Sequence, residues 1–292
     1  LVKLPKYTFP FSFLFLMLIY SPSISASTIH SNQQPINFQI ELLHWKDVNQ
    51  IIPKNSVFTV IDVETGKSFD VQRRAGSHHA DVQPLTRKDT KVMKEIYHGH
   101  WSWRRRAILI LAENRLLAAS MHGMPHGAGA LANGFPGHFC IHFAGSTTHR
   151  TERSDLSHQL MIMKAAGKID DYLAGANPFQ VADALLVFIK NGDKGLIHKV
   201  ALTEKKNLNK QINKIDKIET LRWNRKDSIE DGANDLTITV PVELQLYIKE
   251  SGRVNTKISF QLVRTSPLSP WKINIDDLIS IINETQKEEK KK

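Results

Sequence analysis

The stretch FPGHFCIHF, residues 135–143, decides how the first half of this chain folds. Apolar and polar residues alternate along it, so an extended segment places the two kinds on opposite faces. The apolar face holds Phe139, Ile141 and Phe143, and the polar face holds His138, Cys140 and His142. We therefore predict a β-strand that follows the Pro136-Gly137 turn, buries one face in a core and lines a polar site with the other.

The amino-terminal residues predict export. Lys3 and Lys6 precede the apolar run FPFSFLFLMLIY, and small residues follow up to Ala26, which is the order of a secretory signal with cleavage near that alanine. The run is shorter than the roughly 20 residues that cross a bilayer as a helix, although an uncleaved anchor is an alternative. We expect a signal peptide over residues 1–26 and a bacterial protein that is secreted or associated with the cell envelope.

Cys140 is the only cysteine among 292 residues. Outside the cytoplasm a lone cysteine cannot form an internal disulfide, so it is either a small buried hydrophobic residue or a reactive group. The flanking histidines favour the reactive interpretation, because a protonated imidazole stabilises the thiolate that acts as the nucleophile. We expect Cys140 to be ionised near neutral pH.

The composition narrows the possible partners. Hydrophobic residues make up 41% of the chain, which excludes a disordered protein. The net charge is +10, and removal of the signal peptide takes away only Lys3 and Lys6. A basic exported protein is attracted to anionic surfaces such as cell-wall polymers. No stretch resembles a nucleic-acid-binding module, so we expect no nucleic acid among the partners, and no feature indicates an oligomeric state.

A second group of histidines precedes the predicted strand in SMHGMPHGAGALANG, residues 120–134. The residues up to Ser120 read as the end of a strand, and His122 opens a loop that contains five glycines up to Gly137. Glycines allow a backbone to approach a ligand or a thiol closely. His122 is therefore our candidate for the general base that activates Cys140.

These motifs resemble the catalytic signature of the YkuD-type L,D-transpeptidases. That family carries a His-Gly pair, a loop, and then Ser/Thr-His-Gly-Cys followed by a hydrophobic residue and Asn. In this chain His122-Gly123 precedes Cys140 by eighteen positions, and His138 lies two positions before the cysteine. The resemblance extends over residues 45–150.

The chain is a divergent version of the signature, with the motif Gly-His-Phe-Cys-Ile-His. Gly137 replaces the small hydroxyl residue, Phe139 replaces the glycine before the cysteine, and His142 replaces the asparagine. Ile141 matches the hydrophobic position. The replacements concern the oxyanion geometry and the acceptor, and they leave a nucleophile and a base in place.

The resemblance implies an exported cysteine acyltransferase that acts on peptidoglycan stem peptides, as an L,D-transpeptidase or an L,D-carboxypeptidase. Cys140 would attack a stem carbonyl, expel the terminal D-alanine and pass the acyl group from a thioester to an amine or to water. His122 would be the base, oriented by the carbonyl of Gly123, and His138 would polarise the stem or hold the thiolate. Backbone N–H groups at Cys140 and the neighbouring Phe139 would stabilise the oxyanion. This reaction needs no cofactor and no metal.

Further residues are candidates for contacts with the substrate or with the catalytic groups. They are His79, Asp81, His126, His142, Trp103 and Arg105. Asp81, in SHHAD, could orient a histidine, and alternatively it could stabilise a turn. The stretch HWSWRRR, residues 100–106, could stack indoles on sugar rings and pair guanidiniums with carboxylates, although such residues also pack cores and solvate their edges.

The flanking patterns agree with a mainly β catalytic domain over residues 36–160, which the resemblance implies is a β-sandwich with a short helix. Residues 56–76 and 106–121 read as two hairpins. Between them, Thr86 and Asp89 predict the N-cap and the N3 position of a helix that stops at Gly99.

Two other functions stay open. A zinc-dependent wall hydrolase or metal binder could use His122, His138 and Cys140. His138 and His142 would be too far apart to share one ion, because four steps along a strand separate their Cα atoms by roughly 13 Å. A non-catalytic wall-binding protein is the third possibility.

The second half of the chain has a different pattern. We expect a helical linker over residues 161–176, an α+β accessory domain with a curved antiparallel sheet over residues 177–283, and a disordered basic tail over residues 284–292. Asn177 caps a helix that begins at Pro178. Helices followed by strands resemble the nuclear transport factor 2-like domains, which implies a role in binding, dimerisation or substrate positioning.

Overall fold

The computed structural model describes residues 37–148, 153–225 and 235–289. The predicted signal peptide, residues 1–26, lies outside these ranges. Among the described helices, none is both long and apolar enough to cross a membrane.

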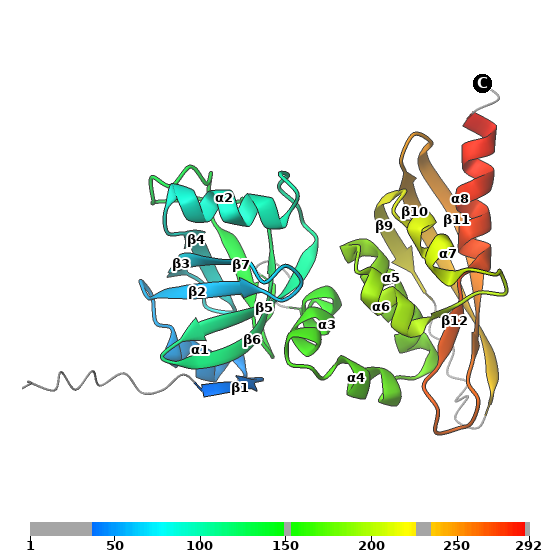
Figure 1. Cartoon of the computed structure of the whole chain (residues 1–292), viewed down its shortest axis with the longest axis horizontal. Coiled ribbons are helices and arrows are strands. Elements are labelled where there is room, and N and C mark those ends of the chain that lie inside the picture. The colour runs from blue at the N-terminus through cyan, green and yellow to red at the C-terminus, as the bar shows by residue number, and fades with distance from the viewer. Residues whose placement is uncertain (1–36, 149–152, 226–234, 290–292) are drawn as a thin grey trace, which may run out of the picture. The chain divides into compact units, whose positions relative to one another are not determined.

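Six antiparallel strands form a closed barrel in the first half of the chain (Figure 1). They are β2 (Val57–Asp62), β3 (Ser68–Ala75), β4 (Ala80–Pro84), β5 (Arg105–Ala112), β6 (Arg115–His122) and β7 (Phe139–His142). The order is β6-β5-β2-β3-β4-β7, and β7 pairs with β6 to close the ring. β1 (Asn37–Glu41) adds a parallel strand to β6. We expected a sandwich, and the pairing of β7 on both of its sides makes a barrel instead.

Both predicted hairpins are confirmed, as β2 with β3 and β5 with β6. Alternation along these strands builds the barrel core: β2 buries Phe58 and Val60, and β3 buries Phe69 in the same way. α1 (Trp45–Ile51) adds Trp45 to this core. Full burial of one large apolar side chain contributes about 1.5–3 kcal/mol, so the barrel has its own source of stability.

The predicted helix between the hairpins is confirmed as α2 (Arg87–Ile96). Thr86 is its N-cap: the Thr86 side chain accepts a hydrogen bond from the Asp89 N–H at 3.2 Å, and the Asp89 carboxylate accepts one from the Thr86 N–H at 2.9 Å. Gly99, at φ 84°, turns the chain after the helix. Met93 is fully buried and anchors α2 to the core.

Replacing Thr86 with alanine removes this cap. We expect the free energy of unfolding to fall by about 1 kcal/mol, because the Asp89 N–H loses its acceptor. Urea denaturation measures the change. Lys88→Ala, an exposed position in the same turn, is the control and should leave stability near that of the wild type. Equal stabilities of the two variants would contradict a role for the cap.

The structure differs from the predicted linker over residues 161–176. α3 (Leu156–Ala165) begins earlier and packs against β5 and β6, because Leu160 and Met161 are buried. The Asp155 carboxylate caps α3 by accepting a hydrogen bond from the Ser157 N–H at 2.8 Å. α4 (Ile169–Gly175) follows. The barrel therefore has α3 as a further layer on two of its strands.

The rest of the chain is an α+β unit with a mixed five-stranded sheet in the order β8-β12-β11-β10-β9. Its strands are β8 (Ala201–Leu202), β9 (Ile218–Asn224), β10 (Thr237–Ile248), β11 (Gly252–Val263) and β12 (Lys272–Asn274). Its helices are α5 (Pro178–Asn191), α6 (Lys194–Val200), α7 (Leu208–Ile215) and α8 (Asp276–Glu289). We expected an antiparallel sheet. The observed sheet is mixed, because β8 runs parallel to β12.

The Asn177 cap is confirmed, since its side chain accepts a hydrogen bond from the Gln180 N–H at 2.9 Å and Pro178 is the first helical residue. The predicted disorder from residue 284 is wrong over the described residues, because α8 continues to Glu289. The buried Ile282 anchors this part of α8, and Lys217 donates a hydrogen bond to Gln286. Residues 290–292 lie outside the described ranges. The chain thus comprises a mainly β domain followed by an α+β domain.

Candidate functional site

β7 lies between β4 and β6, with Cys140 opposite Asp81 and His142 opposite Ser120. The predicted division of its faces is confirmed. The core contains Phe139, Ile141 and Phe143. On the other face, Cys140 and Asp81 meet several imidazoles, and we call this group the histidine cluster. Its histidines are His79, His122, His126, His138, His142 and His158.

The glycine-rich loop after β6 is closed by its own main chain. The His126 N–H donates to the carbonyl oxygen of His138, and the His138 N–H donates to that of His126, both at 2.9 Å. Gly137 has φ 119°, and a Cβ at this position would lie 2.5 Å from the His126 carbonyl oxygen, so only glycine fits. This closure brings His126 beside β7 and therefore beside Cys140.

Gln83, fully buried in β4, anchors the same loop. Its Nε2 donates to the carbonyl oxygen of Gly137 at 2.8 Å. Its Oε1 accepts from the N–H groups of Ala130 and Leu131, at 2.8 and 3.2 Å. Asn133 donates from the loop to the main-chain carbonyl at the end of β4. The loop is thus held at several points, which fixes the positions of the histidines that it carries.

Cys140 is 3% exposed and its sulfur has polar neighbours. Its Sγ lies 3.3 Å from Nε2 of His126 and 3.7 Å from Oδ1 of Asp81. Burial raises the pKa of the Cys140 thiol, and the negative charge of Asp81 raises it further. The thiol is therefore protonated at neutral pH. The expected thiolate is wrong for this conformation, because the neighbouring carboxylate and the lack of water outweigh the imidazoles.

Hydrogen bonds to backbone carbonyls fix three of the imidazoles. The pairs, with their Nδ1-to-oxygen distances, are His79 and Thr147 (2.8 Å), His126 and Met124 (3.2 Å), and His138 and Ala128 (3.0 Å). A carbonyl oxygen only accepts, so each of these Nδ1 atoms carries a proton. In a neutral ring the lone pair is then on Nε2. For His126 this is the atom that faces the sulfur of Cys140.

His122, the predicted base, has the opposite arrangement. Its Nδ1 accepts a hydrogen bond from the Met124 N–H at 3.3 Å, so a neutral ring carries its proton on Nε2. Burial lowers the pKa of His122 well below its usual value, and the charge of Arg105 lowers it further. A ring nitrogen of His122 lies within 4.8 Å of the Cys140 sulfur. The ring that directs a lone pair at this sulfur nevertheless belongs to His126.

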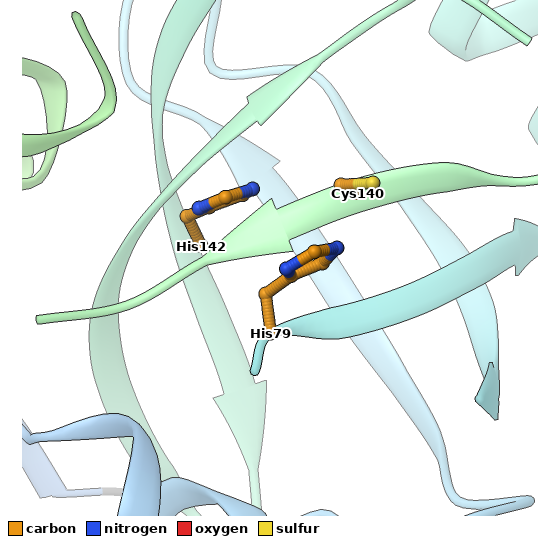
Figure 2. A group of neighbouring side chains, drawn as sticks. All are labelled: His79, Cys140 and His142. Atoms are coloured by element: carbon orange, nitrogen blue, oxygen red, sulfur yellow. The ribbon is translucent and has the colours of Figure 1, made fainter. Parts of the chain in front are cut away.

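Stacked imidazoles form another side of the histidine cluster. Figure 2 shows the rings of His79 and His142 face to face beside Cys140, and their centroids lie 4.4 Å apart at an interplanar angle of 12°. His158, from α3, stacks on His142 at 3.8 Å, and its Nδ1 lies 2.9 Å from the hydroxyl of Ser120. Burial lowers the pKa of His158 well below its usual value. A neutral ring is therefore the form that packs here.

Trp103 and Arg105 lie at the edge of the histidine cluster. Trp103 is 50% exposed, and its ring centroid lies 4.7 Å from that of His122 and 5.6 Å from that of His126. The Arg105 guanidinium donates to the Asp155 carboxylate at 2.7 Å and to the Trp103 carbonyl at 2.6 Å. The indole thus covers two imidazoles at the surface, and Arg105 holds the segment that carries it.

Gly123 and Phe139 lie where the sequence places them, next to the predicted base and the cysteine. The Gly123 N–H donates to the Ser102 carbonyl at 2.8 Å, and a Cβ on Gly123 would lie 2.4 Å from the Tyr97 ring. The Phe139 side chain is fully buried in the core. The orienting and oxyanion roles of both residues concern the main chain and stay predictions.

Groups of possible metal ligands among the described residues all contain Cys140. They are His79 with Cys140 and His142, His122 with His126 and Cys140, and Asp81 with His138 and Cys140, and the ligand atoms of each group lie within 4.8 Å of one another. His138 and His142 fall in different groups, in agreement with the separation expected along a strand. His122 and His138, which the zinc alternative combined, also fall in different groups.

Sequence reasoning missed three features of this site. His126-Gly127 is, like His122-Gly123, a His-Gly pair in the stretch from the end of β6 to the cysteine, and this was an available signal for His126 as a further candidate base. Gln83 lies two positions after Asp81 and therefore on the same polar face of β4, which could have marked it as a residue of the site. His158 carries no such signal, because its role depends on where α3 packs.

The chain matches no protein-family model, no curated protein and no solved structure. The fold and the site define it as a β-barrel protein with a buried cluster of histidines around one cysteine. Its function has to be argued from these residues.

Proposed function

We propose that the protein is an exported cysteine acyltransferase that acts on peptidoglycan stem peptides, as an L,D-transpeptidase or an L,D-carboxypeptidase. The observation that carries this proposal is the 3.3 Å contact between the Cys140 sulfur and Nε2 of His126. A thiol within hydrogen-bond reach of an imidazole lone pair is the arrangement that nucleophilic catalysis requires. The choice of substrate rests on the resemblance to the YkuD-type signature.

His126 replaces His122 as the base in this proposal. Like His122, it is followed by a glycine, Gly127, and lies ahead of Cys140 in the sequence. His126 lies within the loop that joins β6 to β7. The Met124 carbonyl holds the proton on Nδ1 and so orients the ring, which is the role that the resemblance assigned to the carbonyl of Gly123. His122 then acts as a buried support for the ring of His126, whose centroid lies 5.2 Å away.

The first step is attack on a stem carbonyl. The Cys140 sulfur forms a bond to the carbonyl carbon while its proton moves to Nε2 of His126. The protonated ring then returns this proton to the leaving nitrogen, the carbon–nitrogen bond breaks, and the terminal D-alanine departs. A thioester on Cys140 remains. Because the free thiol is neutral, the imidazole acts as a general base during attack, a contribution of about 10²- to 10⁴-fold in rate.

The second step transfers the acyl group. An amine of another stem, or water, loses a proton to His126 and attacks the thioester carbon, and the sulfur leaves with that proton. An amine acceptor gives a cross-link, and water gives a shortened stem. Trp103, half exposed beside His126, offers an apolar surface against which a stem or a sugar ring could pack.

The buried sulfur requires an approach path for the substrate. His138 is 17% exposed in its side chain and lies on the loop that covers Cys140. The loop contains Gly127, Gly134 and Gly137, all at positive φ. In this proposal the loop admits the substrate: a shift that breaks its hydrogen bonds to Gln83 would open the sulfur to a stem carbonyl. The α+β domain, whose element order resembles the nuclear transport factor 2-like class, would position the wall or a partner.

Purified muropeptides with a tetrapeptide stem test the proposal. The wild-type protein should release D-alanine and produce either a tripeptide stem or a cross-linked dimer, both identified by mass spectrometry. Cys140→Ala should produce neither. His78→Ala, an exposed position in the loop before β4, is the matched control and should behave like the wild type. Muropeptides left intact by wild-type protein would contradict the proposal, and wall binding without turnover would favour a non-catalytic protein.

A further inference from the structure

The histidine cluster directs several electron-pair donors toward one region beside Cys140. Nε2 of His79 lies 3.2 Å and Nε2 of His138 lies 3.9 Å from Oδ1 of Asp81. Both Nδ1 atoms donate to backbone carbonyls, so in the neutral rings these Nε2 atoms carry lone pairs. Imidazole nitrogens and a carboxylate that lie this close together are the types of ligand that bind zinc in proteins.

Two of the three groups of possible ligands are poor metal sites. In the group with His122 and His126, Nδ1 of His122 already accepts the Met124 N–H, so its other nitrogen carries the proton. In the group with His79 and His142, the rings are stacked at 12°. Because imidazole lone pairs lie in the plane of the ring, those of stacked rings run side by side and do not converge on one ion.

The third group, Asp81 with His138 and Cys140, has suitable geometry. Oδ1 of Asp81 lies 3.7 Å from the Cys140 sulfur and 3.9 Å from Nε2 of His138. A tetrahedral zinc ion with bonds of 2.0–2.3 Å separates its ligand atoms by about 3.3–3.6 Å. The two separations from Oδ1 of Asp81 need to shorten by only a few tenths of an ångström, and the Cys140 sulfur lies within 4.8 Å of a ring nitrogen of His138.

The surroundings of this group resemble those of a metal site. The Ala128 carbonyl accepts the Nδ1 proton of His138 and so fixes the ring with Nε2 inward. His79 lies against the Asp81 carboxylate and is itself oriented by the Thr147 carbonyl.

We propose that Asp81, His138 and Cys140 bind one divalent transition-metal ion of the zinc type. The thiol releases its proton to solvent when the metal–sulfur bond forms. The bound ion coordinates the sulfur of Cys140, the proposed nucleophile, and therefore blocks acylation until the ion is removed. This regulatory consequence rests on the proposed function, whereas the metal site stands on the geometry alone.

Cobalt(II) titration of the full chain, stripped of metal beforehand, tests the site. We expect one equivalent to bind with a sulfur-to-cobalt charge-transfer band and the intense visible bands of a tetrahedral ion, and zinc should displace it. Cys140→Ser should lose the charge-transfer band. Asp81→Asn and His138→Gln should weaken binding by at least about ten-fold.

Controls separate this site from its neighbours. His122→Gln should still bind cobalt, because His122 belongs to a group that we exclude. His78→Ala, exposed in the loop before β4, should bind like the wild type. Less than one equivalent bound by wild-type protein, or a charge-transfer band that survives in Cys140→Ser, would overturn the inference. Equal losses in His122→Gln and His138→Gln would assign the ion to a different set of ligands and would also overturn it.

Treating the same samples with a penem-type acylating agent distinguishes the proposed acyltransferase from the proposed metal site. A metal-free protein that is acylated, and that zinc protects, supports both. A protein that is acylated equally with and without zinc refutes the metal block and leaves the acyltransferase standing. A protein that binds one zinc through Cys140 but is not acylated when metal-free refutes the proposed function and the block, and retains the metal site.

Discussion

Replacing His126 with glutamine is expected to slow the acylation of Cys140 by about 10²- to 10⁴-fold, the contribution of a positioned general base. The reason is that Nε2 of His126 lies 3.3 Å from the sulfur and is the atom left without a proton when the Met124 carbonyl binds Nδ1. Since the thiol is neutral, its attack on a carbonyl cannot proceed efficiently unless a base accepts the thiol proton. The measurement is the rate of acylation of metal-free protein by an activated acyl donor.

His122→Gln is the matched comparison, since it makes the same substitution at the neighbouring pair His122-Gly123. We expect a much smaller loss of rate, because Nδ1 of His122 already accepts the Met124 N–H and the ring supports the site through packing against Trp103 and His126. Added imidazole should partly restore the rate of a His126→Gly variant, which a purely structural role would not allow. A larger loss in His122→Gln than in His126→Gln would contradict the assignment and return the role of base to His122.

Replacing Asp62 with asparagine is expected to lower the free energy of unfolding by about 3–5 kcal/mol, the effect of breaking a buried ion pair. The Asp62 carboxylate is fully buried and accepts hydrogen bonds from Nε and one terminal nitrogen of Arg106, at 2.7 and 2.8 Å. It also accepts from the N–H and the hydroxyl of Thr65. Removing its charge leaves the Arg106 guanidinium with a weaker amide acceptor at position 62 and with the partly exposed carboxylate of Glu64, 3.0 Å from one terminal nitrogen.

Urea denaturation measures this loss, and hydrogen exchange in β2 and β5 locates it in the barrel. Glu95→Gln is the control, because Glu95 pairs with Lys67 at 2.6 Å on the surface of the same domain, with side chains 44% exposed. Solvent screens that pair, so we expect no measurable change. Similar losses in the two variants would show that burial does not determine the strength of these ion pairs.

The two faces of β7 could be predicted because a strand has a period of two residues. The alternation from His138 to Phe143 separates polar from apolar side chains whatever the strand pairs with. The helix caps at Thr86 and Asn177 could be predicted as well, because each depends on residues within three positions of one another.

The choice between His122 and His126 could not be made from the pattern, because both precede a glycine ahead of the cysteine. The decision depends on the main-chain pair between His126 and His138, which spans the glycine-rich loop. It also depends on Gln83, which fixes the loop from another strand. Such long-range hydrogen bonds leave no local periodicity in a sequence.

The pKa of the Cys140 thiol was expected to be lowered, and it is raised instead. The reason is related. The sequence reveals the neighbouring histidines of the strand, but it does not reveal that Asp81 lies directly opposite the cysteine in β4. The closed barrel buries the thiol and its register places Asp81 beside it, and burial together with this charge raises the pKa of the thiol. The position of His158 could not be predicted either, because His158 reaches the histidine cluster only through the packing of α3 on β5 and β6.

The most direct measurement is the intact mass and peptide map of the metal-free protein after incubation with a penem-type acylating agent. We expect one adduct, on the peptide that contains Cys140, formed with wild-type protein and His78→Ala and absent from Cys140→Ala. A wild-type protein that acquires no adduct under these conditions, or one modified elsewhere in the chain, would contradict the claim that the barrel presents a reactive cysteine.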